Sequence, residues 1–216
     1  LWGFGAGSVQ RDALRLPDPA VLASTRQRCG WQRILLDRAQ RKVRQTGGVH
    51  LDFSGIAKGY AVDLVAQALR ECGCVSWLAE VGGELVGEGV KADGQPWWVA
   101  LERPPQDDGP AMVVALHGLA IATSGDYRRY VDHDGQRYAH TIDPRTGTPV
   151  RSALASVTVL HRHCMVADAL ATVLTVLGEE AGLSFARERG IAALFITREA
   201  RAFRETLTPA LAAMLE

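Results

Sequence analysis

The sequence has no net charge, few lysines and no long hydrophobic run. Lys plus Arg and Asp plus Glu each total 24 residues, so the net charge is zero and nothing draws the chain to nucleic acid or to an anionic membrane. The longest uncharged run, residues 109–125, is interrupted by His117-Gly118 and is not hydrophobic enough to span a bilayer. We therefore expect no nucleic-acid partner and no transmembrane segment. Only three of the basic residues are lysines, and one of them, Lys58, lies in a segment discussed below.

Cysteine is also scarce, and its spacing excludes the common metal and redox motifs. None of the four cysteines forms a Cys-x-x-Cys pair; they are Cys29, Cys72, Cys74 and Cys164. We expect four unbridged, mostly buried thiols. His161, His163 and Cys164 lie close together in the sequence, but a zinc site needs further ligands at regular spacing, and none lies nearby.

Length and composition are those of an ordinary globular protein. The 216 residues are 47% hydrophobic and 22% charged, which suits one domain or two small ones. The chain begins Leu1-Trp2-Gly3, without Met and without the features of a signal peptide. We expect a single domain over residues 1–216 whose N-terminal part lies before Leu1.

Apolar spacing and turn residues predict a mixture of helices and strands. Helices are expected at 20–28, 55–69, 166–177 and 179–189. Strands are expected at 34–37, 42–44, 51–53, 75–81, 97–101, 113–116, 119–122, 156–160 and 191–196, the last of these being the final strand. Hairpins are expected around His117-Gly118 and around the polar turn 132–135. Mixed elements with several hairpins favour an α+β fold with a mixed, largely antiparallel sheet and packed helices over a doubly wound parallel sheet.

The segment Asp52–Tyr60, DFSGIAKGY, is the first candidate site. Backbone N–H groups at a helix start lack partners and favour an anion, and Gly55 lets a ligand approach the backbone closely. Lys58 falls in the first helical turn, where its charge opposes the helix dipole. A bound phosphate would relieve that conflict. The alternative is a surface lysine on a capped helix.

Three further polar segments follow strands or form turns. Gly82-Gly83 permits contact between a ligand and the backbone, or forms a tight turn. Ser124 ends a strand and suits a polar ligand, although Ser124 or Asp126 could equally cap a short helix. His140 shares one face of an extended segment with Ile142, and a purely structural histidine is the alternative.

Asp168 and Thr172 are spaced to share one face of a helix. A carboxylate and a hydroxyl are hard oxygen ligands of the kind that suits Mg²⁺, which binds few protein groups and keeps phosphate oxygens and water. The alternative is an aspartate that simply stabilises the start of its helix.

In order along the chain, these segments resemble one family, the FAD:protein FMN transferases of the ApbE type. The resemblance rests on five boxes: DFSGIAKGY at 52–60, VGGE at 81–84, TSGDY at 123–127, HTIDPRTG at 140–147 and ADALAT at 167–172. Ser54 stands where the family more often has glycine. Family members also carry an earlier stretch with part of the flavin site, which this chain does not show.

The resemblance implies an activity. Family members bind FAD and Mg²⁺, join FMN through its phosphate to a Thr or Ser hydroxyl of an acceptor flavoprotein subunit of a membrane redox complex, and release AMP. An FAD pyrophosphatase that gives FMN and AMP is one alternative, and a non-catalytic flavin-binding protein is another. By analogy the protein is periplasmic or membrane-anchored, but other relatives are cytoplasmic, so the compartment is left open.

The resemblance also implies roles for single residues. Asp168, Thr172 and the carbonyl of Gly55 are expected to bind the metal. Lys58 and His140 are the expected catalytic residues, with His140 helping the attacking hydroxyl to lose its proton. The expected cofactor-binding residues are Asp52, Lys58, Gly82, Gly83, Glu84, Ser124, Gly125, His140, Thr141 and Ile142.

Overall fold

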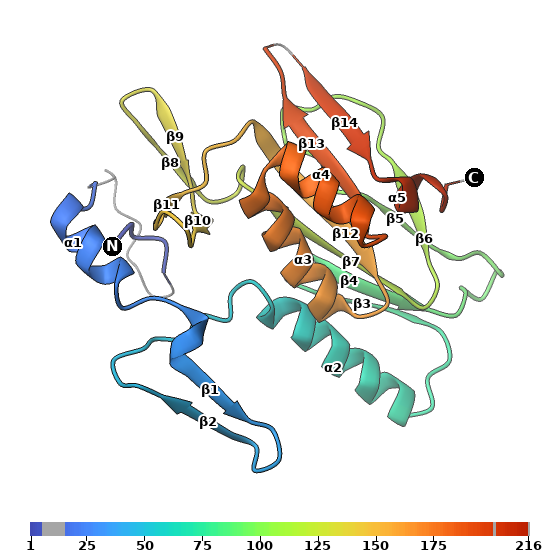
Figure 1. Cartoon of the computed structure of the whole chain (residues 1–216). Coiled ribbons are helices and arrows are strands. Elements are labelled where there is room, and N and C mark those ends of the chain that lie inside the picture. Colours follow the sequence, from blue (N-terminus) through green and yellow to red (C-terminus); the bar gives the residue numbers. More distant parts are fainter. Residues whose placement is uncertain (6–15, 201, 216) are drawn as a thin grey trace. The chain divides into compact units, whose positions relative to one another are not determined.

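The chain folds into two compact units, each built from two segments of the sequence. The computed structural model describes residues 1–5, 16–200 and 202–215 (Figure 1). The first unit comprises Leu1–Asp52 and Arg129–Val150, and the second comprises Phe53–Arg128 and Arg151–Glu216. Whether both act together as the single domain expected over residues 1–216 stays a prediction.

A six-stranded antiparallel sheet forms the second unit's framework, with strand order β14-β13-β12-β7-β4-β3. The strands are β3 Trp77–Val81, β4 Glu84–Glu88, β7 Leu119–Gly125, β12 Leu154–His161, β13 Ala192–Arg198 and β14 Phe203–Leu207. A separate hairpin pairs β5 Trp97–Ala100 with β6 Val113–Leu116. The expected α+β class with a largely antiparallel sheet is confirmed.

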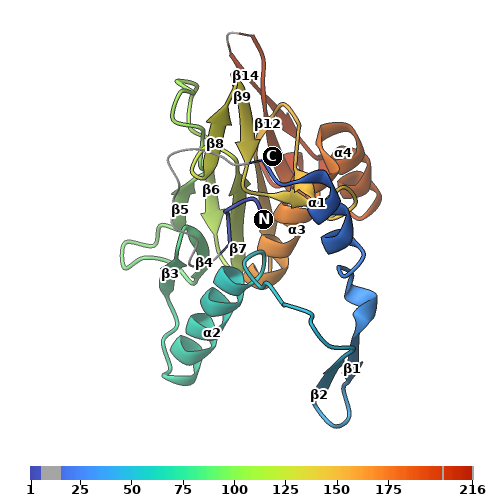
Figure 2. The same ribbon diagram turned by 90° about the vertical axis from the view of Figure 1, so that its left-hand side faces the viewer.

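Helices cover one face of this sheet, and the β5–β6 hairpin covers the other (Figures 1 and 2). The helices on that face are α2 Ala57–Glu71, α3 Cys164–Leu177 and α4 Glu179–Glu188. The short α5 Pro209–Ala212 lies on the hairpin side, where its Leu211 joins the same buried cluster as Leu116. On the helical face, Leu174 of α3 joins a buried cluster with Val157 and Phe195. On the other face, Leu116 joins a cluster with Leu194. Within the part of the chain that the structure describes, no helix combines the length and apolar character needed to cross a bilayer.

Burial of both sheet faces explains the composition of β12. Its first seven residues, Leu154–Leu160, are all buried, so the strand is a nearly continuous run of apolar and β-branched side chains. Its one deeply buried threonine near the centre, Thr158, has its hydroxyl 2.9 Å from the hydroxyl of Thr123 on β7. These two hydroxyls therefore satisfy each other across neighbouring strands, whereas the buried hydroxyls of Ser156 on β12 and Thr197 on β13 have no hydrogen-bond partner among the described residues.

The first unit is built from short elements. They are α1 Pro19–Arg26, the 3₁₀ helix η1 Trp31–Arg33, β1 Ile34–Asp37 with β2 Lys42–Gln45, β8 Tyr130–His133 with β9 Gln136–Ala139, and β10 Ile142–Asp143 with β11 Thr148–Pro149. Asp134 and Gly135 have φ of 50° and 72°, as a two-residue hairpin turn between β8 and β9 requires. The Trp2 indole N–H donates to the carbonyl of Gly147 at 2.8 Å, and its ring stacks on Tyr138.

Three expectations about strands are wrong. Residues 51–53 form no strand, because no neighbouring strand pairs with them where the chain leaves the first unit. Strands β6 and β7 do not pair with each other, because the connection at Gly118 crosses between the two layers: β6 pairs with β5, and β7 pairs with β4 and β12. Strand β14 follows β13, so the strand expected at 191–196 is not the last.

The cysteines are free, but the expectation that most are buried is wrong. Cys29, Cys72 and Cys74 are exposed, and Cys164 is buried at the start of α3. Cys72 and Cys74 flank Gly73, which has a φ of 80° just after the end of α2. The turn that ends this helix therefore carries both thiols to the surface.

Helices α2 and α3 hold each other's first turns through carboxylates. The backbone N–H groups of Cys164 and Met165 donate to Asp63 of α2 at 2.8 and 3.0 Å. In return, the N–H of Gly59 donates to Asp168 of α3 at 3.0 Å. These are N–H groups that the start of a helix leaves unpaired. Neither helix has a capping side chain at its own N-cap residue, so each is capped by the other.

This arrangement predicts that position 59 tolerates only glycine. A Cβ there would lie 2.4 Å from the carbonyl oxygen of Cys164, so the helices would have to separate. We expect Gly59→Ala to lower the free energy of unfolding by about 1–3 kcal/mol, measured by urea denaturation. Gly182→Ala is the matched control, because this helical glycine would place its Cβ at 3.1 Å from the carbonyl of Leu174. Equal losses in both variants would contradict the close approach at Gly59.

Candidate functional site

Lys58 and Glu84 form an ion pair at the start of α2. Lys58 lies in the first turn of α2, as the sequence predicts, and its Nζ donates to Oε1 of Glu84, the first residue of β4. The Lys58 side chain is 46% exposed and that of Glu84 is 2% exposed, so the lysine reaches from solvent to a buried carboxylate. A carboxylate of this chain therefore already balances the lysine charge at the helix start, and no phosphate is needed for that purpose.

Glu84 depends on Lys58 for its charge. Burial raises the pKa of Glu84, and the charge of Asp168 raises it further, while Lys58 lowers it. The second carboxylate oxygen, Oε2, is buried and has no hydrogen-bond partner among the described residues. A carboxylate removed from water stays ionised only where a cation or hydrogen bonds compensate the lost hydration.

The Gly82-Gly83 turn shapes the path of the lysine side chain. Both glycines have positive φ, 65° and 99°, and they form the two-residue turn between β3 and β4, so the tight-turn alternative describes the backbone. Any Cβ at position 82 would lie 3.1 Å from Cδ of Lys58. The turn is thus in contact with the lysine on its way to Glu84.

Hard oxygen atoms gather beside this pair. Asp168 and Thr172 lie one turn apart on α3, and Asp168 is buried with one oxygen accepting from Gly59. The hydroxyl of Thr172 is 3.3 Å from that of Ser124 on β7 and 3.4 Å from the position that a Cβ on Gly55 would take. The structure therefore brings together four predicted site residues from three separate segments of the sequence.

This set of donors fits a hard divalent cation. A carboxylate, a hydroxyl and a backbone carbonyl are the oxygen ligands that Mg²⁺ accepts, and Mg²⁺ needs few of them from the protein. Across residues 1–5, 16–200 and 202–215, no group of three or more His, Cys, Asp or Glu side chains could hold a metal ion. A cation here would accordingly rely on hydroxyl and backbone oxygens as well as on Asp168.

Two polar contacts next to Gly125 were not predicted from the sequence. Arg198 donates to both carboxylate oxygens of Asp126 and so joins the ends of β13 and β7. The hydroxyl of Tyr127 donates to Glu102 at 2.5 Å, and burial together with Glu102 raises the pKa of Tyr127. The alternative of a helix cap at Ser124 or Asp126 is wrong, because β7 runs to Gly125 and Asp126 is engaged by Arg198. The partners are 72 residues apart in the Arg198–Asp126 pair and 25 residues apart in the Tyr127–Glu102 pair, so no local pattern reveals either contact.

His140 lies in the first unit, directly after β9. Its Nδ1 is 3.0 Å from the carbonyl oxygen of Arg129, which also accepts the backbone N–H of His140. Because a carbonyl oxygen can only accept, Nδ1 carries a proton in this contact. In the neutral ring, Nε2 is then the basic nitrogen.

The other expected flavin-site residues of the first unit are Asp52, Thr141 and Ile142. The carbonyl of Thr141 accepts the N–H of Val150 at 2.8 Å, and Ile142 begins β10. Asp52 is an exposed residue at the boundary of the unit. That these residues share one ligand with the second unit stays a prediction.

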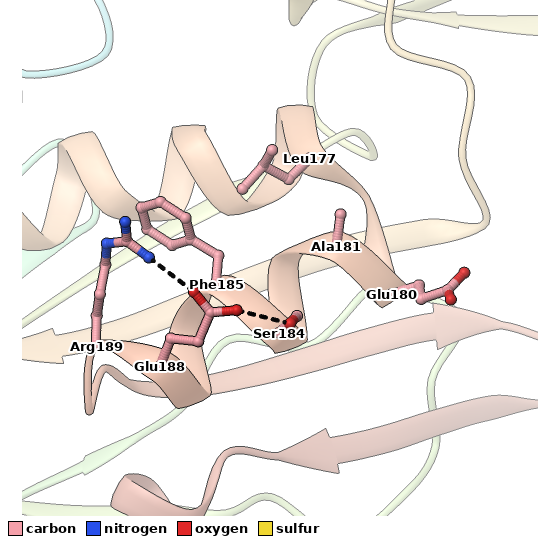
Figure 3. A pocket seen from close by; sticks show the side chains of 7 residues that line it. All are labelled: Leu177, Glu180, Ala181, Ser184, Phe185, Glu188 and Arg189. Atoms are coloured by element: carbon pink, nitrogen blue, oxygen red, sulfur yellow. Dashed lines mark hydrogen bonds and ion pairs between the residues drawn. The ribbon is translucent and has the colours of Figure 1, made fainter.

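A hollow of 520 Å³ lies elsewhere in the second unit, at the end of α3 and along α4 (Figure 3). It is lined by Leu177, Glu180, Ala181, Ser184, Phe185, Glu188 and Arg189. The Arg189 guanidinium lies over the Phe185 ring, and Glu188 bonds to both Arg189 and Ser184. None of the predicted site residues lines this hollow.

The fold and the site define an α+β protein suited to an anionic ligand together with a hard cation. A model of the ApbE family matches residues 1–195. The chain therefore belongs to the ApbE family.

Named relatives and solved structures agree with this assignment. The chain is 38% identical to the FAD:protein FMN transferase of Haemophilus influenzae and 39% identical to that of Vibrio cholerae, over 94% and 95% of its length. It resembles the apo crystal structure of the Pseudomonas stutzeri flavinyl transferase ApbE, with a TM-score of 0.89, 42% identity and coverage of 99% of this chain and 65% of that one. The chain spans 59% and 60% of the length of the two named relatives.

The Lys58–Glu84 pair predicts a pH-dependent loss of stability in Lys58→Met. Without the ammonium group, the pKa of Glu84 in the folded state rises further, while its pKa in the unfolded chain stays at about 4.3. Wild type and variant therefore differ least while Glu84 is protonated in both folded forms, and the loss grows as the pH rises from the folded pKa in wild type to the higher folded pKa in the variant. We expect about 1–3 kcal/mol near neutral pH, since the exposure of Lys58 reduces the cost of a broken buried pair. Urea denaturation at about pH 4 and pH 7 measures it.

The double variant Lys58→Met/Glu84→Gln serves as the control. It removes the carboxylate that titrates, so the difference from wild type should no longer depend on pH. A Lys58→Met deficit that is the same at both pH values would show that Glu84 does not depend on this lysine.

Proposed function

We propose that this protein transfers FMN from FAD to a Thr or Ser hydroxyl of an acceptor flavoprotein and releases AMP. Its membership of the ApbE family and the names of its relatives support this. The observation that carries the proposal is the placement of Lys58 in the first turn of α2 beside Glu84, with Asp168 and Thr172 on the N-terminal half of α3. A cationic side chain beside hard oxygen ligands is the equipment that phosphoryl transfer needs.

The proposed step is a substitution at phosphorus. The hydroxyl oxygen of the acceptor forms a bond to the phosphorus of the FMN half of FAD, and the bond from that phosphorus to the bridging oxygen breaks. The hydroxyl proton passes to a base, and AMP leaves with the bridging oxygen. Such a step depends mainly on positioning and on stabilising charge.

Mg²⁺ is the cation that we propose for the site. Asp168, Thr172 and the carbonyl of Gly55 would hold it, in keeping with their hard oxygen donors. When bound, such an ion neutralises pyrophosphate charge and makes AMP a better leaving group.

The chain's own residues would divide the remaining tasks between them. Lys58 has a half-exposed side chain, and the N–H donors of its ammonium group that Glu84 does not use can bind a pyrophosphate oxygen. His140 can accept the hydroxyl proton at Nε2, because its Nδ1 donates to the carbonyl of Arg129. The Gly82-Gly83 turn and the Ser124-Gly125 strand end offer backbone and hydroxyl groups to the same ligand.

The family resemblance supports a proposal for the acceptor and one for the compartment, where a cytoplasmic location is the alternative. We propose a flavoprotein subunit of a membrane redox complex as the acceptor, and a periplasmic or membrane-anchored location for this protein. Identifying the flavinylated protein in the source organism would test both.

The intact mass of a candidate acceptor tests the activity. After incubation with the full-length protein, FAD and Mg²⁺, we expect the acceptor to gain the mass of one FMN phosphoester. Asp168→Ala should abolish the gain, and Thr172→Val should reduce it strongly while leaving the Gly59–Asp168 hydrogen bond in place. Glu188→Ala, which removes an exposed carboxylate of α4, is the control and should leave the gain unchanged.

Other outcomes of the same experiment separate the alternatives. Free FMN and AMP without a mass gain would identify an FAD pyrophosphatase. Quenching of FAD fluorescence without AMP would identify a flavin-binding protein and would contradict the proposed transfer.

His140→Ala tests the proposed base. We expect the folded, FAD-loaded variant to transfer FMN about 10²–10⁴ times more slowly, which is the usual contribution of a general base. Quenching of FAD fluorescence should show unchanged binding. Transfer at the wild-type rate would exclude His140 as the base.

A further inference from the structure

We propose that Glu84 is a positioning residue, which holds the ammonium group of Lys58 at the ligand site and does not itself contact the flavin nucleotide. The inference rests on the proposed function, because it concerns how Lys58 is prepared for its substrate. It gives Glu84 a different part from the cofactor contact that the family resemblance implies.

Lys58 and Glu84 differ in how far their side chains are exposed to solvent. Glu84 is 2% exposed, so its carboxylate has no surface on which a large nucleotide could rest. Lys58 is 46% exposed and has three N–H donors, of which Glu84 uses one. A ligand therefore contacts the lysine side chain, while the glutamate is buried beneath the lysine.

The surroundings fix the lysine along its length. Its ammonium group is held by Glu84, and its Cδ lies 3.1 Å from the position that a Cβ at residue 82 would take. A free lysine side chain samples many rotamers, and ordering it on binding costs conformational entropy. A lysine that is already ordered in the free protein avoids much of that cost.

The Lys58–Glu84 pair also sets the charge of the ligand site. The groups that act electrostatically on Glu84 are Lys58 and Asp168, so one ammonium group stands beside two carboxylates. Without the lysine, the uncompensated charge of Glu84 would repel a pyrophosphate. Because Lys58 lies between the buried Glu84 and solvent, it turns an acidic position into one that accepts an anion.

The scarcity of lysine makes a direct test practical. The chain has three lysines, so the rate at which an amine reagent modifies each one can be followed by mass spectrometry in the ligand-free protein. In wild type, we expect Lys58 to react more slowly than Lys42 and Lys91, because its ammonium group is hydrogen-bonded to a buried carboxylate and its side chain lies against the Gly82-Gly83 turn. In Glu84→Gln, the rate at Lys58 should rise about three- to tenfold, with Lys42 and Lys91 unchanged.

Glu88→Gln is the matched control. Glu88 lies at the other end of β4 and pairs with Arg70, so its loss should not change the reactivity of Lys58. Should Glu84→Gln fail to fold, the modification rates of the three lysines in wild type still show whether Lys58 is held by its ion pair. A Lys58 as reactive as Lys42, or a rate unchanged by Glu84→Gln, would overturn the proposal.

Kinetics separate positioning from contact. We expect Glu84→Gln to raise the KM for FAD several-fold with a smaller change in kcat, and Glu84→Asp to restore neither the KM nor the low Lys58 reactivity fully, because its carboxylate is one methylene shorter. A change in KM without a change in Lys58 reactivity would show that Glu84 contacts the ligand directly and would overturn the proposal. Labelling needs no FAD, so an inactive wild type would refute the proposed function while the Lys58–Glu84 pairing is still decided.

Discussion

The candidate site depends on one constraint: helices α2 and α3 cap each other, each with a carboxylate at the start of the other. Asp63 satisfies the first N–H groups of α3, and Asp168 satisfies an N–H group of α2. Each helix start favours an anion, so the partly buried carboxylate of Asp63 and the buried carboxylate of Asp168 are each stabilised by a helix dipole. Gly59 lets the backbones approach closely enough for both contacts. This close approach of α2 and α3 also fixes the positions of Lys58 and Thr172.

In the proposed site, Asp168 has two tasks that a sequence motif cannot separate. One of its oxygens caps α2, and its position beside Thr172 suits a cation. A structural role and a metal-ligand role are usually alternative explanations for a carboxylate. In this site, one orientation of the Asp168 side chain suits both roles. The cap holds the side chain in one orientation, and a held carboxylate is a better metal ligand than a free one.

The sequence predicts the local parts of this site and misses the long-range ones. The spacing at 52–60 places Lys58 in a first helical turn, and Asp168 and Thr172 on one helix face, because both follow from helical periodicity. The caps by Asp63, the Arg198–Asp126 pair and the pairing of β6 with β5 depend on residues far apart in sequence. The expected β6–β7 hairpin fails for this reason: turn residues at His117-Gly118 indicate a reversal of the chain but not which strand lies beside it.

Each unit also sets the chemical state of its own reactive groups. The carbonyl of Arg129 fixes the proton of His140 on Nδ1 within the first unit, and Glu84 holds the ammonium group of Lys58 within the second. Neither arrangement needs a ligand or the other unit. Groups that are oriented and charged in advance lose little freedom when a substrate binds, so their interactions can favour the transition state instead of ordering the protein. For a reaction that relies on placement and charge, such preparation within each unit is the part of catalysis that the fold itself can supply.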